Sequence, residues 1–262
     1  MSLWRGRSTR LSTDALAFEG VGRRYAGQIA LNDVTLGIAP GSFVALVGTS
    51  GSGKSTLLRL ANRLDMATTG RVLRDGEDVA HADPIAIRRA TGYVFQNVGL
   101  FPHMTVAENI AIRDRLGGKG SRVDVGAALE RVGLPPAYAT RLPAQLSGGE
   151  QQRVGIARAL AAETRLLLMD EPFGALDPVT RDQLGRTVRA LHDVLGLTTI
   201  LVTHDMAEAL LLADRVLVMA RGRLVADATP ADMLAGEAGP EAAALVAVPK
   251  DQADRLAALA AR

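Results

Sequence analysis

The chain has 262 residues, of which 48% are hydrophobic and 22% charged, and its formal net charge of +2 is small; this length and composition suit a globular protein with a large core. No apolar run approaches the roughly 18 residues of a membrane span, and no apolar segment of a secretion signal follows the basic N-terminus, so we expect a cytoplasmic protein. An aromatic content of only 3% argues against a nucleic-acid partner, and the absence of cysteine excludes disulfides and thiolate metal sites.

The N-terminal part of the chain contains a predicted phosphate-binding loop. We expect a flexible start over residues 1–13 and a strand at VTLGI, residues 34–38. FVALV at 43–47 is a short apolar run typical of a buried strand, and LLRLANRL at 57–64 has helical spacing. Between them, GTSGSGKST at 48–56 matches G-x-x-x-x-G-K-[ST], whose glycines let backbone N–H groups face a phosphate.

This loop indicates a nucleotide ligand with a magnesium ion. Lys54 would reach the β- and γ-phosphates, and the hydroxyl of Ser55 would coordinate Mg²⁺. The alternative is a flexible Gly/Ser turn with a surface lysine, but Lys54 is one of only three lysines among 30 basic residues, which argues against it. The nucleotide ligands predicted in this loop are Gly48, Ser50, Gly51, Gly53, Lys54, Ser55 and Thr56.

The middle of the chain, from about 97 to 160, lacks strong strand signals. Helical patterns run over about 104–115 and 124–132, so we expect a helical subdomain inserted in the nucleotide-binding fold. Near its end, LSGGEQQRVGIARALAA predicts a loop that enters a helix, with Ser147 as the cap and Glu150 three residues later. A plain helix cap is one interpretation. However, a second glycine-rich anion site is redundant in a chain that already has a phosphate loop, which points to a second copy of the chain.

Two later strands end in polar residues that carry chemistry. LLLM at 166–169 is apolar on both faces, as in a buried parallel strand, and leads into Asp170 and Glu171. Because ligands bind at the carboxyl ends of parallel strands, we expect Asp170 to hold Mg²⁺ and Glu171 to orient or deprotonate an attacking water. The alternative is a solvated acidic turn, which the upstream phosphate loop disfavours.

The strand TTILVT at 198–203 points His204 at the same edge, where it would contact the γ-phosphate and the attacking water. A lone histidine is more often structural, and we assign that role to His81, His103 and His192. RVLVM and RLVADA, around Gly222, then predict a hairpin. From about 231 the chain is alanine-rich and predicted to be helical.

These motifs together resemble the ABC (ATP-binding cassette) ATPases, of which LSGGE is the signature. The resemblance covers about residues 14–235, and it leaves 236–262 as a short helical tail. It implies an α/β P-loop NTPase fold with a mostly parallel sheet, an antiparallel β subdomain and an inserted helical subdomain. Members pair head to tail, so that Ser147, Gly148 and Gly149 would bind the γ-phosphate of the ATP held by the partner copy.

The resemblance also implies roles for three residues outside the phosphate loop and signature. Tyr25 stands where the family places an aromatic that stacks on adenine. Gln96, which follows the strand-like YVF, corresponds to a glutamine that senses Mg²⁺ and the attacking water while its loop touches the transporter. Asp177 corresponds to a residue that crosses the dimer interface. The predicted catalytic residues are thus Glu171, His204 and Gln96, and the predicted metal ligands are Ser55, Gln96 and Asp170.

The branch of the family is indicated by two further segments. QNVGLFPHMTVAENI at 96–110 and ANRL at 61–64 are similar to importers of osmoprotectants such as glycine betaine, choline and carnitine. Importers of polyamines, sulfate, iron or amino acids carry close variants, and a soluble DNA-repair or ribosome-associated ABC ATPase is a further alternative. Many osmoprotectant ATPases continue into paired CBS domains, which we do not expect here.

The resemblance implies partners at the cytoplasmic face of the cell membrane. They are a second copy of the chain, transmembrane permease subunits and, indirectly, a solute-binding protein. Phe101, Pro102 and Met104 form an apolar patch that would either meet a permease helix or pack inside the helical subdomain.

Overall fold

The computed structural model describes residues 14–116, 123–161 and 164–260. The expected flexible segment 1–13 lies outside the described residues. Within the described part, no helix is both long enough and apolar enough to cross a membrane.

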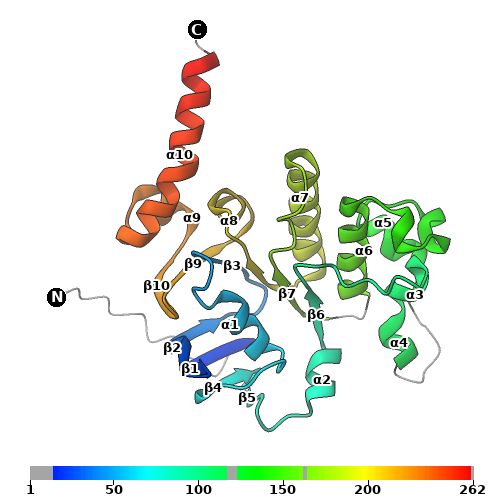
Figure 1. Ribbon diagram of the computed structural model, residues 1–262, viewed down its shortest axis with the longest axis horizontal. Helices are drawn as coiled ribbons and strands as arrows, with labels where there is room; N and C mark the ends of the chain where they lie inside the picture. Colours follow the sequence, from blue (N-terminus) through cyan, green and yellow to red (C-terminus); the bar gives the residue numbers. More distant parts are fainter. Residues whose placement is uncertain (1–13, 117–122, 162–163, 261–262) are drawn as a thin grey trace.

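The centre of the fold is a six-stranded sheet with the order β10-β9-β3-β8-β7-β6 (Figure 1). Five strands are parallel and β10 is antiparallel at one edge, which confirms the predicted mostly parallel sheet and the predicted hairpin. The strands, in chain order, are β3 (Phe43–Val47), β6 (Thr91–Val94), β7 (Leu166–Asp170), β8 (Thr198–Val202), β9 (Arg215–Ala220) and β10 (Arg223–Ala228).

A second, antiparallel sheet has the order β2-β1-β4-β5 and shares a buried apolar cluster with the six-stranded sheet. Its strands are β1 (Leu16–Tyr25), β2 (Gln28–Ile38), β4 (Thr69–Arg74) and β5 (Glu77–Asp78). The predicted strand 34–38 is the second half of β2. Helix α1 (Lys54–Ala61) buries Leu57, Leu58 and Leu60 in one cluster with residues from both sheets.

The continuous apolar strands are explained by burial on both faces. In β7, Leu166 and Leu168 belong to the cluster around α1, whereas Leu167 and Met169 belong to the cluster that contains α6 and α7. All five residues of β7 are buried. A strand covered on both faces has no polar face, which is the reason for its unbroken apolar sequence.

The described residues between 97 and 160 form helices and short 3-10 turns, as expected for the helical part. The first predicted helix begins at Val106 rather than 104, because the Thr105 side chain caps it by accepting from the Glu108 amide. It also breaks in two at Ala111. The helices are α3 (Val106–Ile110), α4 (Ile112–Leu116), α5 (Val125–Arg131) and α6 (Gly148–Leu160), and they lie beyond β6 in Figure 1.

The remaining helices connect the strands or follow the hairpin. They are α2 (Pro84–Arg89), α7 (Pro178–Leu195), α8 (Met206–Leu212), α9 (Pro230–Ala235) and α10 (Pro240–Ala260). The predicted helical tail is therefore present, and α10 projects away from the sheets in Figure 1. His192 of α7 is buried and its Nδ1 lies 2.9 Å from the hydroxyl oxygen of Thr199, a structural contact of the kind expected for it.

Candidate functional site

The polar motifs meet because four neighbouring strands end at one edge of the sheet. Strands β3, β8, β7 and β6 are adjacent and parallel, with Leu46 opposite Val202, Val202 opposite Asp170, and Met169 opposite Val94. The phosphate loop, the Asp170–Glu171 pair, His204 and Gln96 each follow one of these ends. Ligands of open α/β sheets bind at this kind of edge.

The phosphate loop wraps closely around the side chain of Lys54. Its Nζ donates to the carbonyl oxygens of Gly48 at 2.8 Å and Thr49 at 3.0 Å, and it lies 3.4 Å from the Ser52 hydroxyl. The side chain is buried, and burial lowers the pKa of Lys54 below its ordinary value. The loop thus places a cation at the N-terminus of α1, where backbone N–H groups also favour an anion.

Two positions of the loop require glycine because the backbone of another segment lies too close for a side chain. A Cβ on Gly48 would lie 2.2 Å from the carbonyl oxygen of Met219, and one on Gly53 would lie 2.5 Å from that of Ala30. Both glycines also have positive φ, and Gly53 is the left-handed N-cap of α1. The loop can therefore take this shape only with glycine at these positions.

Ser55 and Asp170 form an oxygen pair beside the loop. The Ser55 hydroxyl donates to Oδ1 of Asp170 at 2.8 Å. Burial raises the pKa of Asp170 above its ordinary value, and the charge of Glu171 adds to this, although the Ser55 hydrogen bond opposes it. No cluster of three or more His, Cys, Asp or Glu side chains with metal-site geometry occurs among the described residues. One carboxylate and one hydroxyl suit Mg²⁺, which commonly takes few protein ligands and completes its shell with phosphate and water.

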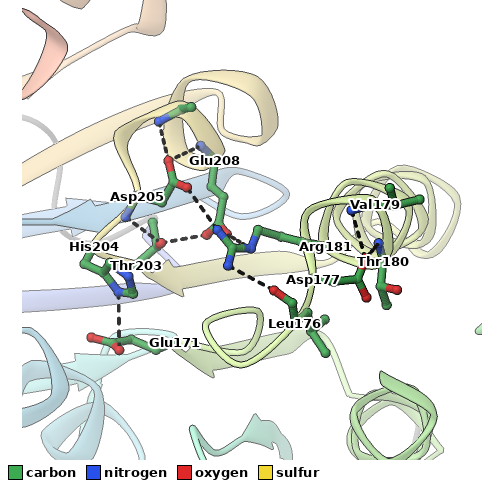
Figure 2. Close-up of polar contacts among 11 residues, drawn as sticks. Glu171, Leu176, Asp177, Val179, Thr180, Arg181, Thr203, His204, Asp205 and Glu208 are labelled. Atoms are coloured by element: carbon green, nitrogen blue, oxygen red, sulfur yellow. Dashed lines mark hydrogen bonds and ion pairs between the residues drawn. The ribbon is translucent and has the colours of Figure 1, made fainter. Parts of the chain in front are cut away.

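Glu171 is the meeting point of three strand ends. Its Oε2 accepts from Nε2 of Gln96 at 3.1 Å. The same oxygen lies 3.4 Å from Nδ1 of His204 (Figure 2). The backbone of Glu171 is left-handed, with φ of 47°, which is unfavourable for a residue with a side chain. The structure therefore brings together the three residues that the sequence analysis predicted to be catalytic, with the carboxylate in the middle.

The signature residues lie elsewhere on the chain. Ser147 accepts from the Glu150 amide, and Glu150 accepts from the Ser147 amide, so the predicted cap is a capping box. Ser147, Gly148, Gly149 and Asp177 share one surface pocket, whose described lining includes no residue of the phosphate loop. Within one chain, the two predicted anion sites are therefore separate.

Asp177 and Tyr25 are held by local contacts. Asp177 caps α7, and hydrogen bonds from Thr180 and then Val179 hold the pKa of Asp177 below its ordinary value. Tyr25 is partly exposed at the end of β1, where its hydroxyl donates to Asp65 and the Arg23 guanidinium stacks 4.4 Å from its ring centroid. Nothing in these contacts joins Tyr25 to the Glu171 cluster.

The apolar patch predicted after Gln96 is partly at the surface. Phe101 and Pro102 are exposed, whereas Met104 is half-buried. The buried side chain of Asn109 holds the backbone around Phe101. Its Oδ1 accepts a hydrogen bond from the Phe101 amide, and its Nδ2 donates one to the Phe101 carbonyl oxygen.

Sequence reasoning missed a polar network behind His204. The Thr203 hydroxyl donates to Oε2 of Glu208 at 2.6 Å and accepts from the Asp205 amide at 3.0 Å. Arg181 of α7 reaches the carboxylates of both Asp205 and Glu208 (Figure 2). One signal was present, because Asp205 stands three residues before Glu208 at a helix start, a spacing typical of capping.

Comparisons with known proteins identify the family of the chain. Residues 31–174 match the family model described as ABC transporter. The choline transport ATP-binding protein OpuBA of Bacillus subtilis (strain 168) is 45% identical over 223 residues, which are 84% of this chain and 58% of OpuBA. The glycine betaine uptake system ATP-binding protein YehX of Escherichia coli (strain K12) is 46% identical over 84% of this chain and 72% of YehX.

Two further matches complete the comparison. The sulfate/thiosulfate import ATP-binding protein CysA 1 of Chromobacterium violaceum is 45% identical over 84% of this chain and 62% of that protein. The dimeric structure of MJ0796, a bacterial ABC transporter cassette, superposes with a TM-score of 0.75 at 33% identity, over 82% of this chain and 98% of that one. This chain thus spans a little more than half the length of OpuBA. The family match, the identity to YehX and the shared fold all agree. The chain therefore belongs to the ABC transporter family, as an ATP-binding cassette.

Proposed function

We propose that this chain is the ATP-hydrolysing subunit of an ABC importer. The observation that carries the proposal is the position of Glu171, whose Oε2 is shared by Gln96 and His204 next to the Ser55–Asp170 pair. A carboxylate held between a donor amide and an imidazole can orient and activate a water. The adjacent loop offers backbone N–H groups and a lysine for the phosphates of the nucleotide.

The residues of the site divide the chemistry among them. The loop over residues 48–56 would bind the phosphates of ATP, and Lys54 would exchange its loop carbonyl contacts for phosphate oxygens. Ser55, Asp170 and Gln96 would hold Mg²⁺, which when bound supplies positive charge to the phosphates. Glu171 would orient or deprotonate the water, and His204 would hold the carboxylate in place. Tyr25, at the end of β1, would stack on the adenine.

We further propose that two copies of the chain form the complete site. Ser147, Gly148 and Gly149 share a pocket with Asp177 and not with the phosphate loop of the same chain. A partner placed head to tail would bring its signature helix to the nucleotide, and a helix N-terminus favours a phosphate there. The similar cassette MJ0796 is described as dimeric, which supports this arrangement.

For the transported solute we propose a quaternary-amine osmoprotectant such as glycine betaine, choline or carnitine. OpuBA is named for choline and YehX for glycine betaine, and both match at 45–46% identity. Another importer class is the alternative, because the sulfate/thiosulfate protein CysA 1 matches at 45%. The subunit would then work peripherally at the cytoplasmic face of the membrane, beneath permease subunits that receive solute from a binding protein. The cassette would span about 14–235, with its helical subdomain at about 97–160.

Hydrolysis by the purified chain with ATP and Mg²⁺ tests the enzymatic part. Glu171→Gln removes the negative charge and keeps the size, so it should bind ATP while turnover falls by at least about 100-fold. Equal turnover in the two proteins would remove Glu171 from the mechanism. Reconstitution with the permease and binding protein, assayed against betaines, choline, polyamines, sulfate and amino acids, tests the solute.

A further inference from the structure

One guanidinium joins the two loops that carry Glu171 and His204. Arg181 lies in the first turn of α7, four residues after Asp177. Its Nη2 donates to the carbonyl oxygen of Leu176 at 3.1 Å, and its Nη1 lies 3.4 Å from Oδ2 of Asp205 (Figure 2). The same side chain therefore contacts the loop after β7 and the loop after β8.

A buried carboxylate continues this connection to the residue before His204. Nε of Arg181 lies 3.6 Å from Oε1 of Glu208, whose other oxygen accepts from the Thr203 hydroxyl at 2.6 Å. The Glu208 side chain is only 12% exposed. Arg181 Nε is itself buried, with no hydrogen-bond partner within normal distance. The Arg181 side chain as a whole is 29% exposed, but its Nε and the Glu208 carboxylate are largely shielded from water. Removing one partner of such a pair leaves the other charge uncompensated.

The geometry points to Arg181 as a positioning residue for His204. Its planar fork presents a different nitrogen to each of Leu176, Asp205 and Glu208, a spread of donors that the compact ammonium group of lysine lacks. Through Glu208 and Thr203 it holds the loop on which His204 faces Glu171. The inference rests on the proposed function in one respect: the contact between His204 and Glu171 has to matter for hydrolysis.

The kinetic test is a double-mutant cycle between Arg181 and His204 in the full chain. Arg181→Ala should lower kcat about tenfold while KM for ATP changes less than about twofold, since it displaces a residue needed only for the chemical step. In the His204→Ala background, the same substitution should cause no further loss, because the residue it positions is already gone. Arg181→Lys, which keeps the charge but not the fork, should fall between Arg181→Ala and the wild type.

The matched control is Arg186→Ala, on the same helix, where Arg186 forms an exposed ion pair with Asp182. It should leave kcat unchanged. The inference would be overturned if Arg181→Ala lowered kcat equally in the wild-type and His204→Ala backgrounds, or if Arg181→Ala alone kept the wild-type kcat. If Arg181→Ala does not fold, the same outcomes apply to Arg181→Lys in the same cycle.

A second measurement does not depend on hydrolysis. The chain has four histidines, so their ring signals can be assigned by NMR through single substitutions. In the nucleotide-free protein, Arg181→Ala or Arg181→Lys should shift or broaden the His204 ring signal, and Arg186→Ala should not. An unmoved His204 signal contradicts the positioning role. If the signal moves but the wild-type protein does not hydrolyse ATP, the positioning role stands and the proposed function is refuted.

Discussion

Oε2 of Glu171 and Nδ1 of His204 lie 3.4 Å apart, at the ends of the neighbouring parallel strands β7 and β8. The His204 side chain is 59% exposed and that of Glu171 is 23% exposed, so the contact opens toward the surface where a partner and a nucleotide would bind.

Replacing His204 should impair hydrolysis more than binding. His204→Ala removes the imidazole beside Glu171 and should lower kcat about 100-fold, within the range of a positioned acid–base group, with little change in ATP affinity. Steady-state hydrolysis and nucleotide titration measure the two effects. His81→Ala, at an exposed position outside the site, is the control. Wild-type turnover in His204→Ala would show that the contact is incidental.

The hydroxyl of Ser55 should set the magnesium requirement. Ser55→Ala removes the donor to Asp170 and one predicted oxygen ligand, so about tenfold more Mg²⁺ should be needed for half-maximal hydrolysis. Ser55→Thr keeps the hydroxyl and should behave like the wild type. The check is a Mg²⁺ titration at saturating ATP. Identical titration curves for all three proteins would exclude Ser55 as a ligand.

The phosphate loop should tolerate a methyl group at Gly51 but not at Gly48. A Cβ on Gly48 would overlap the Met219 carbonyl oxygen at 2.2 Å, which should cost at least about 3 kcal/mol of unfolding free energy. A Cβ on Gly51 meets no atom within 4 Å, and only its positive φ should cost about 1–2 kcal/mol. Urea unfolding of Gly48→Ala and Gly51→Ala compares them. Equal losses of unfolding free energy would mean that the close approach of the Met219 carbonyl is not the reason for glycine at position 48.

Mixing two inactive variants should restore activity if the site is shared between copies. Ser147→Arg blocks the signature and Lys54→Ala the phosphate loop, and each variant alone should be inactive. Random pairing makes about half of the dimers mixed, each with one intact site, so an equal mixture should reach about a quarter of wild-type turnover. Hydrolysis that stays at the level of the separate variants would contradict sharing.

Asp214 should stabilise the start of β3 at neutral pH. It accepts from the Phe43 amide at 2.8 Å and from Nη1 of Arg189 at 2.7 Å. Burial alone would raise the pKa of Asp214, but these hydrogen bonds and the Arg189 charge outweigh it and hold the pKa below its ordinary value. A depressed pKa contributes stability above the unfolded-state value near 3.9, and this contribution is lost as the pH falls through the folded value.

Asp214→Asn should therefore unfold at lower urea than the wild type at pH 7. The difference should shrink as the pH falls below about 4. Asp75→Asn is the control, because its carboxylate is 78% exposed and 4.0 Å from Arg74. A difference that stays constant with pH would exclude the ionised form of Asp214 as the cause.

Much of the fold and site could be predicted from the sequence. The strands β3, β7 and β8 and the capping box at Ser147 were predicted because their signals are local: an unbroken apolar run, or a serine followed three residues later by a glutamate. The break at Ala111 was missed, because the periodicity of 104–115 continues through it.

The sequence by itself determined where the polar motifs stand and that they follow parallel strands, since motif spacing and hydrophobic pattern are properties of the chain alone. Only the tertiary structure decided which atoms meet. The contact of Glu171 with His204 depends on the register between β7 and β8 and on the left-handed backbone at Glu171. The bridge through Arg181 joins segments from two different loops. Such contacts are set by strand order and packing, which no local pattern encodes.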